Sequence, residues 1–271
     1  MPPFSPITLG EKIRSVQAGG FTLTETAHRP GRRLARHAHE RANLAFVLGG
    51  SFSEILDRRQ IECTAQDLLI KPAGEAHANR YGPEGMRCLL VEYPPEWLES
   101  LGPAAGFCGQ VRHVRGGAAP ILALRLYREL GISDGAAPLA IEGLILEITA
   151  DLARRTALAG EASPPRWLRQ ARDLLHARFS ESLNFSEVAG TMGVHPVHLA
   201  REFRRHFRCT PGEYVRRLRV ESAARALSHS DAPLAQIGLA AGFSHQAHFC
   251  RVFKRHTGMT PSEFRSALRS R

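Results

Sequence analysis

The sequence predicts an α+β protein with an N-terminal β-barrel, a helical connector and a C-terminal all-α domain that carries two helix-turn-helix units. Three observations support this prediction: short apolar runs in the first third of the chain, a motif that occurs twice near the C-terminus, and a net charge confined to the part that holds the motif. A chain of 271 residues is long enough for more than one hydrophobic core, so two domains are expected.

The region from residue 21 to about residue 93 is predicted to be rich in β-strands. Its short apolar runs are separated by turn residues such as Gly49-Gly50 and Pro72-Ala73-Gly74, which is the pattern of strands joined by tight turns. The expected strands cover residues 21–24, 44–48, 51–56, 67–70 and 88–92. Many short strands with this punctuation favour a sandwich or a barrel.

Three histidines flank two of these strands. His37 and His39 precede the strand that ends at Gly49, and His77 follows the strand at 67–70. Because alternate residues of a strand point to one face, His37 and His39 are expected to point inward together. Three imidazoles can hold a divalent metal with one open position, so His37, His39 and His77 are candidate metal ligands. A ligand pocket in which they only form hydrogen bonds explains the same pattern, and we weigh it ahead of the metal site.

Residues 94–120 are rich in Gly and Pro and are predicted to be a connection, followed by helices at 121–130 and 139–158. The second helix carries an apolar stripe, formed by Ile141, Leu144, Ile145, Ile148 and Leu152. This stripe packs either on the barrel of its own chain or on a second subunit, and its periodicity fits both. The segment 159–165 is small and polar and ends in two prolines, so it is predicted to be a linker.

The net charge of +10 belongs to the C-terminal part of the chain. Up to Pro165 there are 18 Lys+Arg and 18 Asp+Glu, whereas from Arg166 onward there are 18 Lys+Arg and 8 Asp+Glu. Such a division is expected of a domain that neutralises phosphates beside a partner domain that does something else.

The compartment is predicted from what the sequence lacks. The first 20 residues show no signal-peptide pattern, and no run reaches the roughly 18 apolar residues of a membrane span, so we expect a cytoplasmic protein without membrane contact. The five cysteines include no CxxC pair, which argues against a disulfide framework and against a structural zinc cluster.

A pattern of helix, tight turn and helix occurs twice within the basic part. In the second copy Gly242 lies at the turn, as expected where φ is positive. The copies are offset by 49 residues before the turn and by 50 after it. The matching residues include Val188, Gly193, Leu199, Arg201 and Phe203 in the first copy and Ile237, Gly242, Phe249, Arg251 and Phe253 in the second. Further helices are expected at 167–179 and 212–227, and Asn184 and Glu187 are expected to cap the helix that starts the first copy.

Two helix-turn-helix units joined by a helix, with the segment RVFK at 251–254 and a closing Thr-Pro in each copy, resemble the AraC/XylS family of bacterial transcription regulators. The resemblance covers roughly the last hundred residues. It departs at Gly238, where the family usually has Ala and where glycine costs about 1 kcal/mol of helix propensity. It departs again at Arg208, which replaces the glycine that Gly258 supplies in the second copy.

This resemblance implies DNA contacts from the exposed early positions of each recognition helix. Arginine is suited to guanine, glutamine to adenine, and small apolar side chains to the thymine methyl group. Base contacts are therefore expected from Val197, His198 and Arg201 in the first helix and from Gln246, Ala247, His248 and Arg251 in the second. Phosphate contacts are expected from Arg204, Arg205, Lys254 and Arg255, which come later in the two helices.

The segments 37–39 and 72–77 resemble the two motifs of the cupin barrel, in which paired histidines, a glutamate and a later histidine converge on one metal. Asn43 occupies the glutamate position in this chain, and Gln66 stands where a glycine normally opens the second motif. Glu40 and Glu75 are substitutes for the missing carboxylate, but neither is at the family spacing. The expected effector pocket consists of His37, His39, Asn43 and His77, with a divalent metal as a further candidate.

These features predict a transcription regulator that is not an enzyme. Residues 1–117 would sense a small-molecule effector or an ion, 118–158 would connect the domains and serve as a candidate surface for a homodimer, 159–165 would be the linker, and 166–271 would bind double-stranded promoter DNA. The resemblance also implies contact with RNA polymerase. The competing hypothesis is a metal-dependent cupin enzyme fused to a DNA-binding module, which would require a metal in the barrel.

Overall fold

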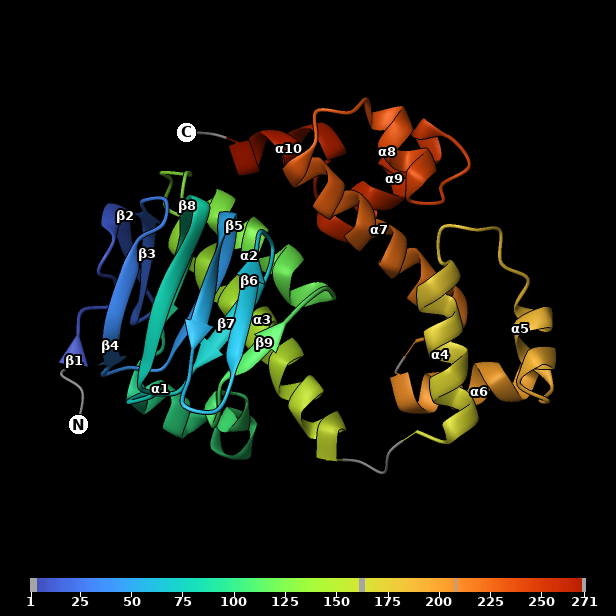
Figure 1. The fold of residues 1–271 in the computed structure, drawn as a ribbon, viewed down its shortest axis with the longest axis horizontal. Coiled ribbons are helices and arrows are strands. Elements are labelled where there is room, and N and C mark those ends of the chain that lie inside the picture. The colour runs from blue at the N-terminus through green and yellow to red at the C-terminus, as the bar shows by residue number, and fades with distance from the viewer. Residues whose placement is uncertain (1–3, 161–163, 208, 270–271) are drawn as a thin grey trace. The chain divides into compact units, whose positions relative to one another are not determined.

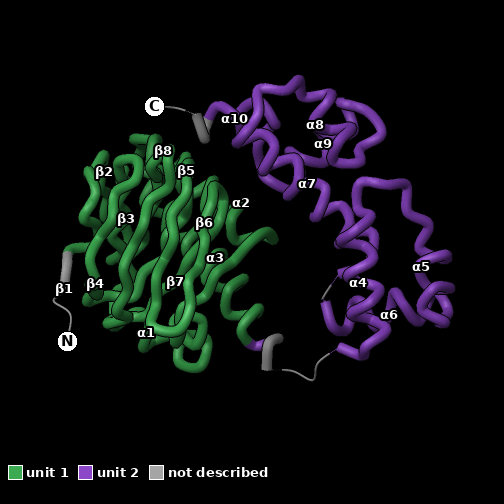
Figure 2. The backbone as a smooth tube through the Cα atoms, in the orientation of Figure 1, with its two compact units in different colours: residues 1–156 green, residues 157–271 purple. Residues whose placement is uncertain are grey.

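The computed structural model describes residues 4–160, 164–207 and 209–269, and it confirms the α+β class, with a sheet domain followed by helices (Figure 1). The chain divides into two compact units, residues 1–156 and 157–271 (Figure 2). The predicted boundaries after residues 117, 158 and 165 stay predictions. Residues 161–163 of the predicted linker, and Arg208, lie outside the described residues. Along the described chain no helix has both the length and the apolar character needed to cross a membrane.

A nine-stranded sheet forms most of the first unit. The strands are β1 (Phe4–Ser5), β2 (Glu11–Ala18), β3 (Phe21–His28), β4 (Arg33–His39), β5 (Asn43–Ile55), β6 (Gln60–Thr64), β7 (Leu68–Lys71), β8 (His77–Glu92) and β9 (Arg112–Val114). Their order is β1-β4-β8-β5-β7-β9, with β3 also on β8, β2 on β3 and β6 on β5. The long strands β5 and β8 pair from Asn43 opposite Glu92 to Ile55 opposite Ala78, so together they form the centre of the sheet.

One predicted turn is a bend inside a strand. Residues 44–48 and 51–56 were expected as two strands, but Leu44 to Ile55 all belong to β5, and the register with β8 shifts on both sides of Gly50. Gly50 has φ +73°, and a Cβ there would collide with the backbone oxygen of Gly85. Glycine therefore allows β5 to bend at a bulge while it remains paired, which two Gly residues in a sequence do not distinguish from a turn.

The helices of the first unit cover its sheet. The predicted connection at 94–120 contains α1 (Pro95–Ser100) and the 3-10 helix η1 (Gly102–Cys108). The two expected helices are α2 (Ala118–Glu129) and α3 (Ala137–Gly160). The apolar stripe of α3 is 1–6% exposed, because it packs within its own unit. This stripe is therefore not available to a second subunit.

The second unit consists of helices (Figure 1). They are α4 (Arg166–Arg178), α5 (Phe185–Thr191), α6 (Pro196–Phe207), α7 (Pro211–His229), α8 (Leu234–Ala240), α9 (Gln246–Thr257) and α10 (Pro261–Arg269). The first helix-turn-helix is α5 and α6, the second is α8 and α9, and α7 joins them. The apolar faces of the recognition helices are buried, with Leu199, Phe203, Phe249 and Phe253 at most 1% exposed.

Capping groups and glycines fix where these helices begin and turn. The side chain of Asn184 accepts a hydrogen bond from the backbone of Ser186, as the sequence predicts for the start of α5. Thr210 and Glu213 form a reciprocal capping box at the start of α7. Gly193 and Gly242 have φ of +67° and +89°, so both turns use the left-handed backbone that favours glycine.

The unusual Gly238 has a packing reason. A Cβ at this position would lie 3.0 Å from side-chain atoms of Phe249, and Phe249 is fully buried. Glycine therefore lets α8 lie close against α9, so the loss of helix propensity accompanies a tighter contact between the two helices of the unit.

Candidate nucleic-acid interface and effector pocket

The predicted DNA-contacting residues lie on the outer faces of α6 and α9. Val197 and Arg201 are exposed on α6, and His198 beside them is partly buried. On α9 the equivalent face is formed by Gln246, Ala247 and Arg251, which are exposed, and His248, which is partly buried. The four later basic residues, Arg204, Arg205, Lys254 and Arg255, are all exposed. Each recognition helix thus has one buried apolar face and one accessible face with side chains of the types that contact base edges and phosphates.

Arg201 is held by neighbours on its own helix. Its Nη2 donates to Nδ1 of His198 at 2.9 Å, and its Nε lies 3.3 Å from Oε1 of Glu202. Glu202 is 9% exposed, and its second oxygen lies 3.7 Å from Arg205. The equivalent of Glu202 in the second copy is Val252. The two recognition arginines therefore start from different electrostatic surroundings.

Two histidines that the sequence reading did not single out begin the recognition helices. Nδ1 of His195 accepts from the backbone N–H of Val197 at 3.3 Å, and Nδ1 of His245 accepts from that of His248 at 3.1 Å. Both bonds satisfy N–H groups that a helix start leaves without an intrahelical partner. His195 and His245 are 50 residues apart, as equivalent positions of the repeat are, and this offset could have identified them. Histidine is an uncommon capping residue, so the sequence pattern did not suggest this role.

His248 is positioned as a neutral hydrogen-bonding group. Ser244 Oγ lies 3.1 Å from its Nδ1. Burial lowers the pKa of His248, and the neighbouring His245 and Arg251 lower it further. A neutral imidazole carries one donor and one acceptor nitrogen, so His248 can form a hydrogen bond to a base edge.

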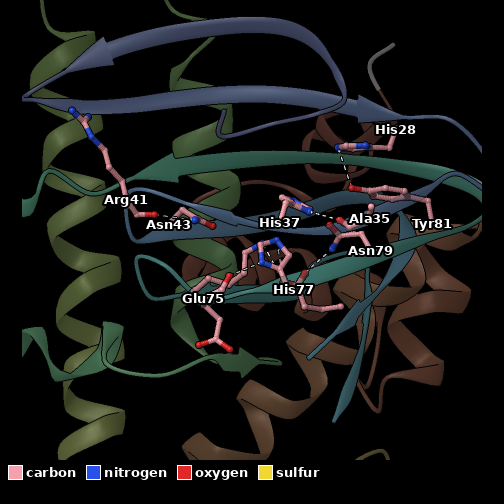
Figure 3. Close-up of polar contacts among 11 residues, drawn as sticks. His28, Ala35, His37, Arg41, Asn43, Glu75, His77, Asn79 and Tyr81 are labelled. Atoms are coloured by element: carbon pink, nitrogen blue, oxygen red, sulfur yellow. Dashed lines mark hydrogen bonds and ion pairs between the residues drawn. The ribbon is translucent and has the colours of Figure 1, made fainter. Parts of the chain in front are cut away.

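The sheet of the first unit brings together the three predicted histidines. His37, His39 and His77 are 4%, 7% and 1% exposed, and one ligating atom from each lies within 4.8 Å of the others. Nδ1 of His37 donates to the carbonyl of Ala35 at 2.8 Å, and Nδ1 of His77 donates to that of Glu75 at 2.9 Å (Figure 3). Because a carbonyl only accepts, Nδ1 carries a proton in both rings, and the neutral form of each ring has its lone pair on Nε2.

Two charged residues that the sequence reading missed complete this cluster. Lys71 Nζ lies 2.9 Å from Nε2 of His77 and 3.2 Å from Oε1 of Glu54. Asn79 Nδ2 donates to the other oxygen of Glu54 at 2.8 Å. Glu54 is 0% and Lys71 7% exposed, so this is a buried ion pair. Alternate residues of a strand point to the same face. Glu54 comes two residues after the buried Phe52, and Lys71 comes two residues after the buried Leu69, so this alternation could have predicted that both point inward.

A cavity of about 40 Å³ lies beside the cluster. His37, His39, Glu54 and Lys71 line its polar part, and the N-terminal residues Ile7, Thr8 and Leu9 line another part together with Tyr81 and Met86. Asn43 is not among the lining residues. It is 1% exposed, and its Nδ2 donates to the carbonyl of Arg41 at 3.2 Å. The structure therefore brings His37, His39 and His77 together, but of these only His37 and His39 line the cavity. His77 and Asn43 do not line it, although all four were predicted to share one pocket.

A divalent metal fits the histidines but not their present surroundings. Nε2 of His77, the lone pair that a metal would need, already accepts from the Lys71 ammonium. Burial, together with the neighbouring Lys71, lowers the pKa of His77 to about 2, so the ring is neutral as a metal ligand must be. However, a dication beside this ammonium would be repelled. With Lys71 in place, the site fits an internal cation rather than a bound metal.

Comparison with known proteins gives matches to both halves of the chain. Residues 22–149 match the family model described as AraC-like ligand binding domain, and residues 188–267 match a helix-turn-helix domain model. The probable transcription factor PqrA of Proteus vulgaris is 41% identical over 67 residues, which are 25% of this chain and 55% of that protein. The transcriptional activator RhaS of Pectobacterium atrosepticum is 30% identical over 118 residues, 42% of each chain. The chain thus spans about half or less of the curated relatives it matches.

Solved structures give matches of the same kind. A transcriptional regulator with an AraC-type DNA-binding domain from Chromobacterium violaceum is 32% identical, over 38% of this chain and 93% of that one, with a TM-score of 0.37. ToxT from Vibrio cholerae O395 is 12% identical, over 93% of this chain and 99% of that one, with a TM-score of 0.38.

Proposed function

Because the chain belongs to the AraC family, with a ligand-binding domain followed by helix-turn-helix units, we propose that it is a transcription regulator that binds promoter DNA through α6 and α9. The observation that carries this proposal is the duplication. Two helices with the same buried pattern present the same side-chain types at equivalent exposed positions, Arg201 and Arg251 among them. A single basic helix face would be explained by solubility alone, whereas two matched faces on one unit suit successive major grooves.

We propose further that the first unit is the sensor. Its cavity of about 40 Å³ has room for a few water-sized groups, since one of them needs about 10–15 Å³. An ion or a small molecule fits as the cavity stands, and a larger effector needs it to open. The contacts offered at its polar part are the ammonium of Lys71, the carboxylate of Glu54 and the imidazoles of His37 and His39. The buried Lys71 beside His77 disfavours the alternative of a metal-dependent enzyme, because it takes a ligand atom that catalysis would need.

Two partners are part of this proposal. Both relatives called RhaS are described as transcriptional activators. We therefore propose that this chain activates transcription through contact with RNA polymerase, in the cytoplasm where promoter DNA lies.

A homodimer would use the outward face of α3, because the inward stripe is buried. Leu139 and Leu146 on that face are 75% and 51% exposed, and Gly143 between them has open space around it.

The experiment that tests this function is selection from a library of random double-stranded DNA by the full chain. We expect a site of two unlike halves, because α9 has Gln246 and Ala247 where the equivalent positions of α6 are Pro196 and Val197. The halves should be separated by about one helical turn, roughly 34 Å. Recovery of unenriched sequences, with equal affinity for every duplex, would contradict the proposal.

A further inference from the structure

The turn of the second helix-turn-helix contacts the segment that precedes the first one, so the continuous helix α7 is not the only link between the two. The segment that follows α4, residues 179–182, belongs to the first half of the second unit. Arg219, in the middle of α7, donates from Nε to the carbonyl of Phe179 at 2.7 Å and from Nη2 to that of Glu181 at 2.7 Å. Carbonyls at a helix end lack intrahelical donors, so the guanidinium fixes this segment against α7 with two charge-assisted bonds.

The turn of the second helix-turn-helix lies directly on the same segment. Gly242 has φ +89°, and a Cβ there would lie 2.6 Å from the backbone oxygen of Ser180 and 2.7 Å from its Cα. Real Cβ atoms essentially never approach backbone so closely, so the absence of a side chain is what permits the contact. Gly242 is therefore required twice, by its backbone conformation and by the neighbouring chain.

We infer that Arg219 and Gly242 form a clamp that fixes the separation and angle between α6 and α9, and so determines which spacing of the two DNA half-sites is bound. This inference rests on the proposed DNA-binding function. One added base pair rotates a half-site by about a tenth of a turn and moves it by about 3.4 Å along the duplex. A rigid pair of helices discriminates against such a change, whereas two units joined by α7 alone accommodate it by bending. Arg219 is thus a positioning residue, because it acts on DNA recognition through the backbone of residues 179–181.

The test compares the full chain with the Arg219→Met variant on designed duplexes. Selection by the wild type first supplies the two-part site. Binding is then measured by fluorescence anisotropy to that site, to versions with one base pair inserted or deleted between the halves, and to duplexes that keep one half only. We expect the wild type to lose about ten-fold or more in affinity on a change of spacing, comparable to a mismatched base pair. Arg219→Met should lose less than about three-fold on the same change, and it should bind single halves within about two-fold of the wild type.

Two further variants separate the clamp from loss of charge and from loss of folding. Arg216→Met removes an exposed arginine three positions earlier on α7, so it should leave the discrimination between spacings unchanged. Gly242→Ala disturbs the same contact from the other side, and it should relax the discrimination even if Arg219→Met fails to fold. The clamp would be overturned if either variant, Arg219→Met or Gly242→Ala, binds single halves and still discriminates between half-site spacings as strongly as the wild type. A wild type that selects no site would instead overturn the DNA-binding proposal.

Discussion

At the scale of single residues, the exposed side chains of α6 and α9 fall into two groups with different expected DNA contacts. The exposed positions of α6 and α9 combine early residues, such as Arg201 and Arg251, with later ones, such as Arg204 and Lys254. Early positions of a recognition helix reach base edges, and later ones meet the phosphates of the DNA. Among the described residues, no ion pair engages Arg251 or Lys254, so each is available to DNA.

Arg251→Ala should therefore reduce specific binding more than binding to random DNA. Loss of a bidentate contact to a base costs about 1–3 kcal/mol and relaxes preference at one position, whereas loss of a phosphate contact weakens all sequences and lowers the salt slope by about 1. Lys254→Ala is the matched control and should leave the specificity ratio nearly unchanged. Affinities over a salt series for selected and random duplexes decide the matter. If both variants lose affinity equally for selected and random duplexes, Arg251 contacts DNA phosphates rather than a base.

Lys71→Met should give the barrel a metal site that the wild type lacks. Removing the ammonium frees Nε2 of His77 and leaves Glu54 as a carboxylate partner. We expect affinity for Co²⁺ to rise about 100-fold or more when the ammonium is removed. Two unit charges of the same sign about 4 Å apart repel by roughly 4 kcal/mol at an effective dielectric constant of about 20. Tetrahedral Co²⁺ absorption bands would report the site, and His77→Ala in the same background should abolish them. Equal Co²⁺ binding by wild type and variant would show that Lys71 does not occupy the site.

His28 makes the first unit sensitive to acid. Burial, assisted by Arg32, lowers its pKa from 6.5 to about 4, so the folded state keeps it neutral while the unfolded state binds a proton below pH 6.5. The contribution of His28 to the free energy of unfolding is therefore constant above pH 6.5 and falls by up to about 1.4 kcal/mol per pH unit toward pH 4. Urea unfolding at pH 7 and pH 5 should show a smaller difference for His28→Gln than for the wild type. Identical differences would mean that His28 does not contribute.

These residues also show how far sequence reasoning reached within the sites. The accessible faces of α6 and α9 followed from the repeat, because equivalent positions in two copies constrain one another. The buried pair Glu54 and Lys71 was missed, because an acidic or basic residue within a strand is exposed by default. Asn43 was misplaced because motif spacing gives the position along a strand but not which neighbours fill the space beside it.

At the scale of elements, backbone conformation explains where the prediction held and where it failed. The recognition helices, their glycine turns and the capping by Asn184 were all predictable from local rules. The strand β5 was predicted as two strands, because a bulge at Gly50 and a turn share the same residues. The short helices α1 and η1 were read as connection, since proline begins helices as well as interrupting them.

Gln66 provides a test of this backbone reasoning. It occupies the position at which the resemblance expects glycine, and it has φ +71°, the only positive φ of a residue other than glycine among those described. Its backbone N–H donates to the carbonyl of Val47 at 2.8 Å, a bond that glycine or alanine at this position would keep. A left-handed conformation costs roughly 1–2 kcal/mol outside glycine, and glycine itself loses about 0.5–1 kcal/mol of entropy.

Gln66→Gly should therefore raise the free energy of unfolding by up to about 1 kcal/mol, measured by denaturant titration. Gln66→Ala is the control, since it keeps the backbone strain and should be no more stable than the wild type. If the glycine variant is as destabilised as the alanine variant, the side chain of Gln66 contributes more than its backbone costs.

At the scale of the whole molecule, the proposed sensing and the proposed DNA binding belong to different units of the chain. The cavity and its ion pair belong to the unit of residues 1–156, and both recognition helices belong to that of residues 157–271. Every unit of net positive charge lies in residues 166–271, since the first 165 residues are neutral. This division was readable from composition and from the repeat, because charge and periodicity are properties of the sequence itself. The identity of the effector was not, because it depends on the shape of a cavity made by residues from distant strands.

The most direct test of the account is a hydroxyl-radical footprint of the full chain on its selected duplex. We predict two protected patches on one face of the DNA, about 34 Å apart, with Arg201→Ala weakening one patch and Arg251→Ala weakening the other. A single protected patch, or two variants that weaken the same patch equally, would contradict the claim that the two helix-turn-helix units read separate halves of one site.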